Sequence, residues 1–154
     1  MLYYLGIGSN IGEREQTIRE ALHMLDQQVG RRIDVAPLMY SKPQGFCSEH
    51  EFCNTVALYE SPLQPEEVLL RTQTIEQQLG RTEHSVILPD GTKLYADREI
   101  DIDLIQAFND AGEEVRCDTP TLTLPHPRMN EREFVRIPLQ QLHQHITQLH
   151  HGKR

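Results

Sequence analysis

Four stretches of the chain have the residue types or the hydrophobic pattern typical of strands, and a period of two residues indicates a strand with one buried face. The clearest case is DREIDIDLI at 97–105, where Ile100, Ile102 and Leu104 alternate with Asp101 and Asp103. The predicted strands lie at about residues 2–8, 33–41, 51–60 and within 97–105.

Apolar residues at helical spacing predict two helices between these strands. The first ends near Gly30. The second lies in the segment SPLQPEEVLLRTQTIEQQLGR, which begins with Ser61 and Pro62, has an acidic turn after Pro65 and ends its apolar stripe at Gly80. The polar stretch 81–96 predicts a turn or small hairpin around LPDGTK, and residues 109–112 predict another hairpin turn. After two further prolines the chain ends in a predicted helical region.

This order of elements predicts an α+β fold. A β-α-β-β-α-β succession, followed by a hairpin and a C-terminal helix, is typical of ferredoxin-like folds, in which helices cover one face of a mostly antiparallel sheet. With 154 residues, 38% of them hydrophobic, the chain is long enough to bury a substantial core. We therefore expect one domain over residues 1–154.

The charge balance and the N-terminal sequence argue against nucleic acids and membranes as binding partners. Fifteen Lys and Arg against 23 Asp and Glu give a net charge of −8, which disfavours a general nucleic-acid surface or an anionic-membrane anchor. The segment MLYYLGIGSN has no basic region, and no apolar stretch reaches membrane-spanning length. These features predict a cytoplasmic protein.

The cysteines and histidines do not form a clear metal site. Three cysteines are an odd and sparse set, which favours reduced thiols over a disulfide framework. Cys47, His50 and Cys53 are spaced as three potential ligands, but structural zinc needs four. The clustered histidines near the C-terminus, His143, His145, His150 and His151, are more typical of an exposed helix than of a metal tract.

Asp101 and Asp103 form the polar face of the last predicted strand. Residues at i and i+2 of a strand point to the same face about 6.5 Å apart, so their carboxylates can hold one hard cation or bridge two. Magnesium prefers such oxygens together with phosphates and water. A half-buried strand also commonly presents acids to solvent, so both interpretations stay open. Arg98 suits a phosphate and favours the metal site.

The segment GIGSNIG at 6–12 follows the first strand. Its glycines are spaced one residue out from the G-x-G-x-x-G dinucleotide fingerprint, and the elements after it do not repeat a β-α-β unit. We therefore set aside a Rossmann oxidoreductase and predict a tight turn in which Ser9 or Asn10 caps the first helix.

Other groups suit ligands but are also typical of ordinary structure. Gln73 and Glu76 are neighbours on the second helix, which alone indicates a solvated face. Phe52 and Asn54 could hold a flat heteroaromatic ring, although core packing is the simpler interpretation of a strand phenylalanine.

A further group lies in LPHPRMNEREF. There His126, Arg128 and Arg132 precede Phe134, and this concentration of cationic groups in an acidic protein suggests an anion site.

Together these segments resemble the 6-hydroxymethyl-7,8-dihydropterin pyrophosphokinase family over nearly the whole chain. The resemblance rests on GIGSNIG, FCNTVALYE, TQTIEQQLGR, REIDIDLI and LTLPHPRMNEREFVRIPL, which occur in the family's order and context. Its most specific part is the R-x-x-D-x-D signature of Arg98, Asp101 and Asp103, combined with the L-P-H and R-x-F elements downstream.

The resemblance implies an enzyme of folate biosynthesis that acts on two small molecules, ATP and the reduced hydroxymethylpterin. It transfers the terminal two phosphates of ATP to the pterin hydroxymethyl oxygen, giving AMP and the pterin diphosphate. Two Mg²⁺ ions on Asp101 and Asp103 are also implied. Metals that bridge phosphates and acidify the hydroxyl make a separate nucleophilic side chain unnecessary. We expect the enzyme to be a monomer.

The resemblance also implies which positions contact each ligand. The catalytic positions are Arg98, Asp101 and Asp103. The nucleotide-binding positions are Gln73, Glu76, Arg81, Arg98, Thr123, His126 and Arg132. The pterin-binding positions are Ser41, Pro43, Gln44, Gly45, Phe52, Asn54, Tyr95 and Phe134. Of these, Phe52 and Phe134 resemble the pair that sandwiches the ring, Asn54 and the 41–45 loop read its edge, and Tyr95 replaces a capping aromatic residue.

The departures from the family pattern concern the segment 81–98, which is longer than in common bacterial members and is expected to close over ATP. Glu83 stands where a basic residue is frequent, and Asp97 adds a third acid. This extra negative charge leaves open a paralogue that binds pterin or nucleotide without efficient transfer. A small metal-binding module built on cysteines and histidines is a third hypothesis with little support.

Overall fold

The computed structural model describes residues 1–9, 13–41, 51–80, 85–87, 93–95, 100–127 and 135–142. Its elements are β1 (Leu2–Ser9), α1 (Arg14–Gln28), β2 (Arg31–Val35), β3 (Met39–Ser41), β4 (Phe52–Glu60), α2 (Pro65–Gln78), β5 (Ser85–Ile87), β6 (Lys93–Tyr95), β7 (Asp101–Phe108), β8 (Cys117–Asp118) and β9 (Thr123–Leu124). Residues 135–142 are also helical.

The main sheet is antiparallel and has the strand order β2-β4-β1-β7, with β3 also pairing with β4. β1 pairs with β4 along its full length and with β7 from Leu2 to Gly8. The sheet is open, and β7 forms one of its edges. Together with the helices, this confirms the predicted α+β class.

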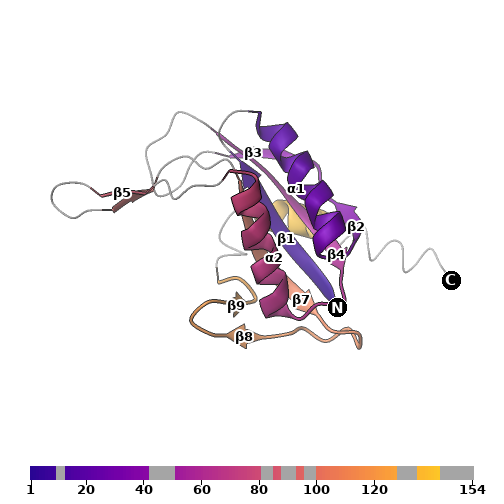
Figure 1. The fold of residues 1–154 in the computed structure, drawn as a ribbon. Helices are drawn as coiled ribbons and strands as arrows, with labels where there is room; N and C mark the ends of the chain where they lie inside the picture. Colours follow the sequence, from indigo (N-terminus) through magenta and orange to yellow (C-terminus); the bar gives the residue numbers. More distant parts are fainter. Residues whose placement is uncertain are drawn as a thin grey trace.

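Helices lie on both faces of this sheet. α1 and α2 lie side by side on one face, and the helix of residues 135–142, drawn in yellow, lies behind the sheet (Figure 1). Side chains of β1 divide between the two cores: Tyr3, Leu5 and Ile7 pack towards α1 and α2, and Tyr4 packs towards residues 135–142. The expectation that helices cover a single face is therefore wrong for the third helix.

The helix boundaries follow from local chemistry. α2 begins with Pro65, whose missing N–H costs nothing in the first turn, and Glu66 and Glu67 lie at the positive end of the helix dipole. It is followed by Gly80 with φ +87°, a left-handed conformation that glycine adopts without strain. Both predicted helices are confirmed.

The predicted strand at 33–41 is interrupted in the structure. β2 ends at Val35 and β3 begins at Met39, and both pair with β4. Pro37 lies in the gap and has no N–H to donate to the ladder, which explains the break.

β5 and β6 pair antiparallel on either side of the turn predicted around LPDGTK, of which residues 88–92 lie outside the described residues. The predicted turn at 109–112 is present. After β7, the turn at 109–112 is closed by the Asn109 side chain, whose oxygen accepts the N–H groups of Ala111 and Glu113. Within the described part of the chain, no helix is long and apolar enough to cross a membrane.

β7 contains a bulge at Ile105. Leu104 lies opposite Leu5 and Gln106 lies opposite Tyr4, so Ile105 is an extra residue in the ladder. Before the bulge, Asp101 and Asp103 alternate with core residues as predicted.

Gly30 connects α1 to β2 where the backbone passes close to the end of β4. A Cβ atom at Gly30 would lie 2.1 Å from the Glu60 carbonyl oxygen and 3.0 Å from the Ser61 Cα. Both are backbone atoms, and the Ser61 hydroxyl is bonded to the Val29 carbonyl at 2.6 Å. Neither the Gly30 backbone nor the backbone of Glu60 and Ser61 can move without disturbing the connection between α1 and β2.

We predict that Gly30→Ala lowers the free energy of unfolding by about 3 kcal/mol or more, because overpacking here displaces backbone. Gly112→Ala is the matched control: Gly112 has φ +80° and no atom within 4 Å of an added Cβ, so only about 1 kcal/mol of backbone strain is expected. Urea denaturation measures both. Equal losses in the two variants would contradict the close contact at Gly30.

Candidate active site

The sheet face opposite α1 and α2 is divided into an apolar half and a polar half. Residues 135–142 cover the apolar half, which contains Tyr4, Val56, Leu58 and Ile105. Burial and the nearby charge of Asp34 raise the pKa of Tyr4 to about 12, so its hydroxyl is neutral. The polar half lies where β1 ends and β7 begins and contains Gly6, Gly8, Phe52, Asn54, Asp101 and Asp103.

The two aspartates belong to this polar half because of the strand register. Asp101 lies opposite Gly8, and Asp103 lies opposite Gly6. Opposite residues of an antiparallel pair have their side chains on the same face of the sheet. Both carboxylates therefore lie on the face where Gly6 and Gly8 have no side chain. Both aspartates are partly buried.

Gly6 and Gly8 contribute no side chains at the centre of the polar half, and we call this part of β1 the glycine floor. A Cβ atom at Gly6 would lie 3.1 Å from Ile105 Cδ1, so the Ile105 side chain lies against the floor from the β7 side. A Cβ atom at Gly8 would lie 2.7 Å from Asn54 Oδ1 and 3.5 Å from Phe52 Cδ1. The side chains of Phe52 and Asn54 therefore lie against the floor from the β4 side.

The glycine floor corrects the prediction for GIGSNIG. The strand continues to Ser9, whose side chain is fully buried, and the N-cap of α1 is Glu13 without a side-chain cap hydrogen bond. Asn10 lies outside the described residues. The floor itself was not predicted, although two glycines at i and i+2 of a strand always share one face.

The predicted pterin positions on β3 and β4 are adjacent. Asn54 is buried at 5% exposure, and its side-chain amide donates to the Phe52 carbonyl at 3.3 Å. The backbone of Ser41 on β3 lies opposite Phe52. Phe52 is partly exposed, which a ring that stacks on a ligand requires.

Several predicted nucleotide positions gather along the edge of β7. Glu76 Oε2 accepts the Ile102 N–H at 2.9 Å, and the Ile105 carbonyl accepts the His126 N–H at 2.8 Å. Thr123 is exposed on β9, which packs against β7, and Gln73 is exposed one turn before Glu76. Glu76 is only 6% exposed, so the interpretation of this helix surface as a solvated face is wrong at that position.

The remaining residues that the sequence analysis singled out for the site lie outside the described part of the chain: Pro43, Gln44, Gly45, Arg81, Glu83, Asp97, Arg98, Arg132 and Phe134. For Tyr95 the structure describes its strand, β6.

Cys53 is part of the core beneath α1 and is fully buried. Burial raises the pKa of its thiol, and the charge of Glu15 adds to this while Arg14 opposes it. A buried neutral thiol is a poor metal ligand. Cys47, His50 and the C-terminal histidines lie outside the described residues, and among the residues that are described no three His, Cys, Asp or Glu side chains converge on a metal position.

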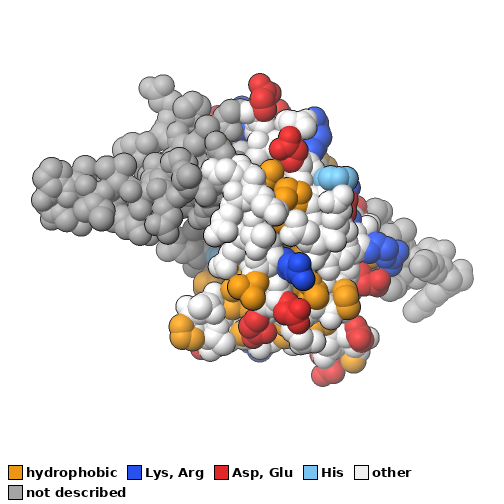
Figure 2. Space-filling view, in the orientation of Figure 1, with side chains coloured by type: hydrophobic (Ala, Val, Ile, Leu, Met, Phe, Trp, Pro, Cys, Tyr) orange, Lys and Arg blue, Asp and Glu red, His pale blue; other side chains and the backbone are white. Residues whose placement is uncertain are grey.

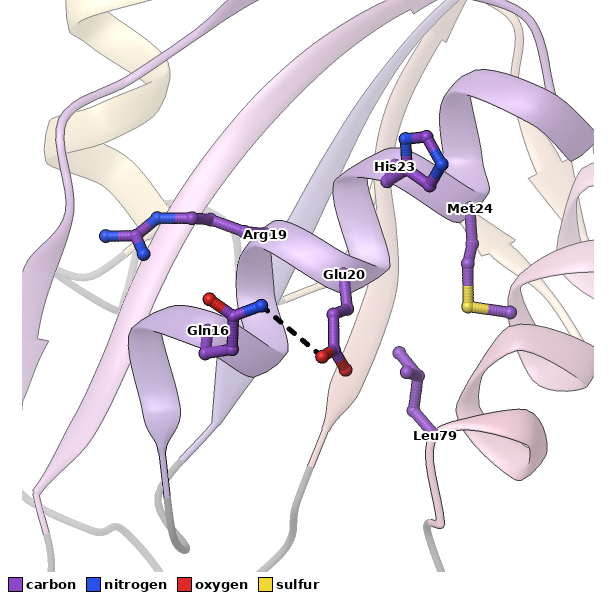
Figure 3. Close-up of a pocket in the computed structure, with 6 residues that line it drawn as sticks. All are labelled: Gln16, Arg19, Glu20, His23, Met24 and Leu79. Atoms are coloured by element: carbon purple, nitrogen blue, oxygen red, sulfur yellow. Dashed lines mark hydrogen bonds between the residues drawn. The ribbon is translucent and has the colours of Figure 1, made fainter.

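The outer surface of the helices carries a separate hollow of about 410 Å³, lined by α1 residues and Leu79. Figure 3 shows Met24 and Leu79 turned towards each other, with Gln16 bonded to Glu20 at 3.4 Å beside them. Figure 2 shows the same face, where acidic and basic side chains are scattered among hydrophobic ones. The hollow lies on the other side of the sheet from the aspartates, because α1 packs on the opposite face.

Comparisons with known proteins identify relatives over most of the chain. A family model described as 7,8-dihydro-6-hydroxymethylpterin-pyrophosphokinase matches residues 4–144. A 2-amino-4-hydroxy-6-hydroxymethyldihydropteridine pyrophosphokinase of Porphyromonas gingivalis is 41% identical over 138 residues, or 90% of this chain and 88% of the relative. The Bacillus subtilis protein of the same name is 34% identical over 93% of this chain and 78% of its own length. A folic acid synthesis protein of Schizosaccharomyces pombe is 36% identical over 88% of this chain but only 17% of its own length.

These matches define the class of enzyme as an ATP-dependent diphosphotransferase. Within that class, the chain belongs to the 7,8-dihydro-6-hydroxymethylpterin-pyrophosphokinase family, because the family model covers residues 4–144. The family predicted from the sequence motifs is confirmed.

We predict that Gly8→Ala displaces the Asn54 side chain and costs about 1–2 kcal/mol of folding free energy, because its Cβ would overlap Asn54 Oδ1. In an Asn54→Ala background the same change is expected to cost less than half as much. Urea denaturation of the two single variants and the double variant gives the coupling energy. Gly112→Ala, in the turn after β7 and outside the sheet, serves as the control. An unchanged cost of Gly8→Ala in both backgrounds would contradict the contact.

Proposed function

We propose that this protein transfers the terminal diphosphate of ATP to the hydroxymethyl oxygen of 6-hydroxymethyl-7,8-dihydropterin, giving AMP and the pterin diphosphate for folate biosynthesis. Family membership supports this reaction. The observation that carries the proposal is the register of β1, which separates the aspartate pair from Phe52 and Asn54 by the glycine floor.

ATP is proposed to bind along the edge of β7. Gln73, Glu76, Thr123 and His126 support this position, because all four belong to elements that pack against that edge. Arg81, Arg98 and Arg132 are the cationic residues assigned to the nucleotide, and guanidinium groups match phosphate oxygens in a bidentate geometry.

The pterin is proposed to bind over β4, with its ring stacked between Phe52 and Phe134. Asn54 and residues 41–45 would read the ring edge by hydrogen bonds, and Tyr95 would cap it. Asn54 and Asp101 both lie opposite Gly8, so their backbones are separated by two strand spacings, or about 10 Å. Within this interval β1 adds no side chain of its own at Gly6 or Gly8, and the side chains that lie against the floor come from Asn54 and Phe52 on β4 and from Ile105 on β7.

Asp101 and Asp103 are proposed to hold two Mg²⁺ ions. The donor set fits this metal, because two carboxylates on one face leave coordination positions for phosphate oxygens and water. When bound, the ions would neutralise phosphate charge and acidify the attacking hydroxyl.

The contribution of the chain is mainly to align the two substrates. The pterin oxygen forms a bond to the β-phosphorus of ATP, the bond from that phosphorus to the α-phosphate oxygen breaks, and the hydroxyl proton passes to solvent. Phe52, Asn54 and the β7 edge hold the reacting groups in line, and such alignment is one of the two sources of rate in phosphoryl transfer, the other being stabilisation of the phosphate charge.

We extend the proposal to the remaining properties of the chain. A ferredoxin-like fold is supported by the succession β1-α1-β2-β4-α2-β7 and by the order β2-β4-β1-β7 of the antiparallel sheet. We also propose one domain over residues 1–154, acting as a monomer in the cytoplasm.

The decisive experiment incubates the protein with Mg-ATP and the reduced hydroxymethylpterin and measures AMP. We expect AMP and pterin diphosphate to form in equal amounts, and AMP to depend on the pterin. AMP at the level of a no-enzyme control, with the pterin still bound, would instead establish a protein that binds its ligands without transfer.

We predict that Asp101→Asn and Asp103→Asn each lower kcat by about a thousandfold, because the loss of a metal ligand removes several kcal/mol of transition-state stabilisation. The unfolding free energy should change little, since both side chains lie outside the cores. Asp118→Asn, exposed on β8, is the matched control and should be fully active. Wild-type turnover in either of the first two variants would exclude the proposed metal site.

A further inference from the structure

Glu76 occupies a position that would ordinarily hold a hydrophobic residue. The buried residues of α2 are Pro65, Val68, Thr72, Ile75 and Glu76; Pro65, Val68 and Thr72 follow one another at steps of three and four residues, and Ile75 and Glu76 lie three and four residues after Thr72. Glu76 therefore belongs to the stripe that packs on the sheet. A carboxylate at 6% exposure costs folding free energy unless hydrogen bonds compensate it, so its presence calls for a specific partner.

That partner is the backbone of the strand that carries the aspartates. Glu76 Oε2 accepts the Ile102 N–H at 2.9 Å, and Ile102 stands between Asp101 and Asp103. Because β7 is the edge of the sheet, β1 holds this segment from one side only. Asp101 is also the first residue of β7, where its pairing with β1 begins. The Glu76 carboxylate holds the segment from the other side.

We propose that Glu76 is a positioning residue for the two aspartates, an inference that rests on the proposed diphosphate transfer. Its carboxylate fixes the backbone between Asp101 and Asp103, so that their side chains are already oriented before metal and nucleotide arrive. This differs from the role of nucleotide contact that the family resemblance implies for Glu76. Groups that orient metal ligands typically change metal affinity by about 10–100-fold when they are removed.

The first measurement is amide hydrogen exchange of the protein without ligands. In Glu76→Ala, the Ile102 amide should exchange about tenfold faster or more, because its hydrogen bond is lost. Glu76→Gln retains a side-chain oxygen that can accept this N–H and should restore most of the protection. Gln77→Ala, on the exposed side of the same helix turn, is the matched control and should exchange like the wild type.

The second measurement is a titration with Mn²⁺ alone, followed by paramagnetic broadening of the amide signals of residues 101–103. We expect Glu76→Ala to need about tenfold more Mn²⁺ for half-maximal broadening, with Glu76→Gln close to the wild type. In the AMP assay, Glu76→Ala should lower kcat and raise the required Mg²⁺ concentration, while KM for ATP changes less than about twofold.

Unchanged exchange at Ile102 in Glu76→Ala would overturn the proposal, and so would faster exchange with unchanged Mn²⁺ affinity. A raised KM for ATP with normal Mn²⁺ binding would assign Glu76 to nucleotide contact instead. Exchange and Mn²⁺ binding are measured without turnover, so they test the positioning role even if the wild-type protein forms no AMP. Because Glu76→Gln keeps the shape of the side chain, it also provides the comparison if Glu76→Ala fails to fold.

Discussion

The pairing of β1 with both β4 and β7 is the constraint on which the rest of the molecule depends. The groups on the polar half of the sheet face are placed by their register against this one strand: Asn54 opposite Gly8 on one side, and Asp101 opposite Gly8 on the other. The same strand carries Leu5 and Ile7 into the core beneath the helices. A shift of one residue would exchange these two sets of side chains between the faces, so folding stability and the assembly of the site depend on the same hydrogen bonds.

One face of the sheet serves as both core and site. Residues 135–142 cover only the apolar half, and the carboxylates lie beyond that cover, where they remain partly exposed. Charged groups can therefore lie within a few residues of a packed core without the full cost of burial. Glu76 is the exception, because it is buried on the helix side of the sheet edge and is retained there through a bond to the strand backbone.

Periodicity was sufficient to predict elements and faces within an element. It placed Asp101 and Asp103 on one side of a strand, and it located both main helices. It could not predict which face a helix would cover, because an apolar stripe shows only that a helix packs against something. The break at Pro37 was missed because apolar residues continue on both sides of it. The glycine floor and the buried Glu76 were misinterpreted for a related reason: their roles depend on residues of β4 and β7 that are distant in sequence.

The bulge at Ile105 uncouples the facing of the side chains before it on β7 from the facing of those after it. Its extra residue lets Gln106 and Phe108 lie on the same face as Tyr4, while Ile102 and Leu104 remain in the other core. Insertions and deletions during evolution therefore have unequal consequences along this strand. An insertion or deletion of one residue next to Ile105 can be absorbed by enlarging or removing the bulge. The same change between Asp101 and Leu104 would shift the register and move an aspartate side chain to the core face of the sheet. The length of the acidic segment is thus far more constrained than that of the strand as a whole.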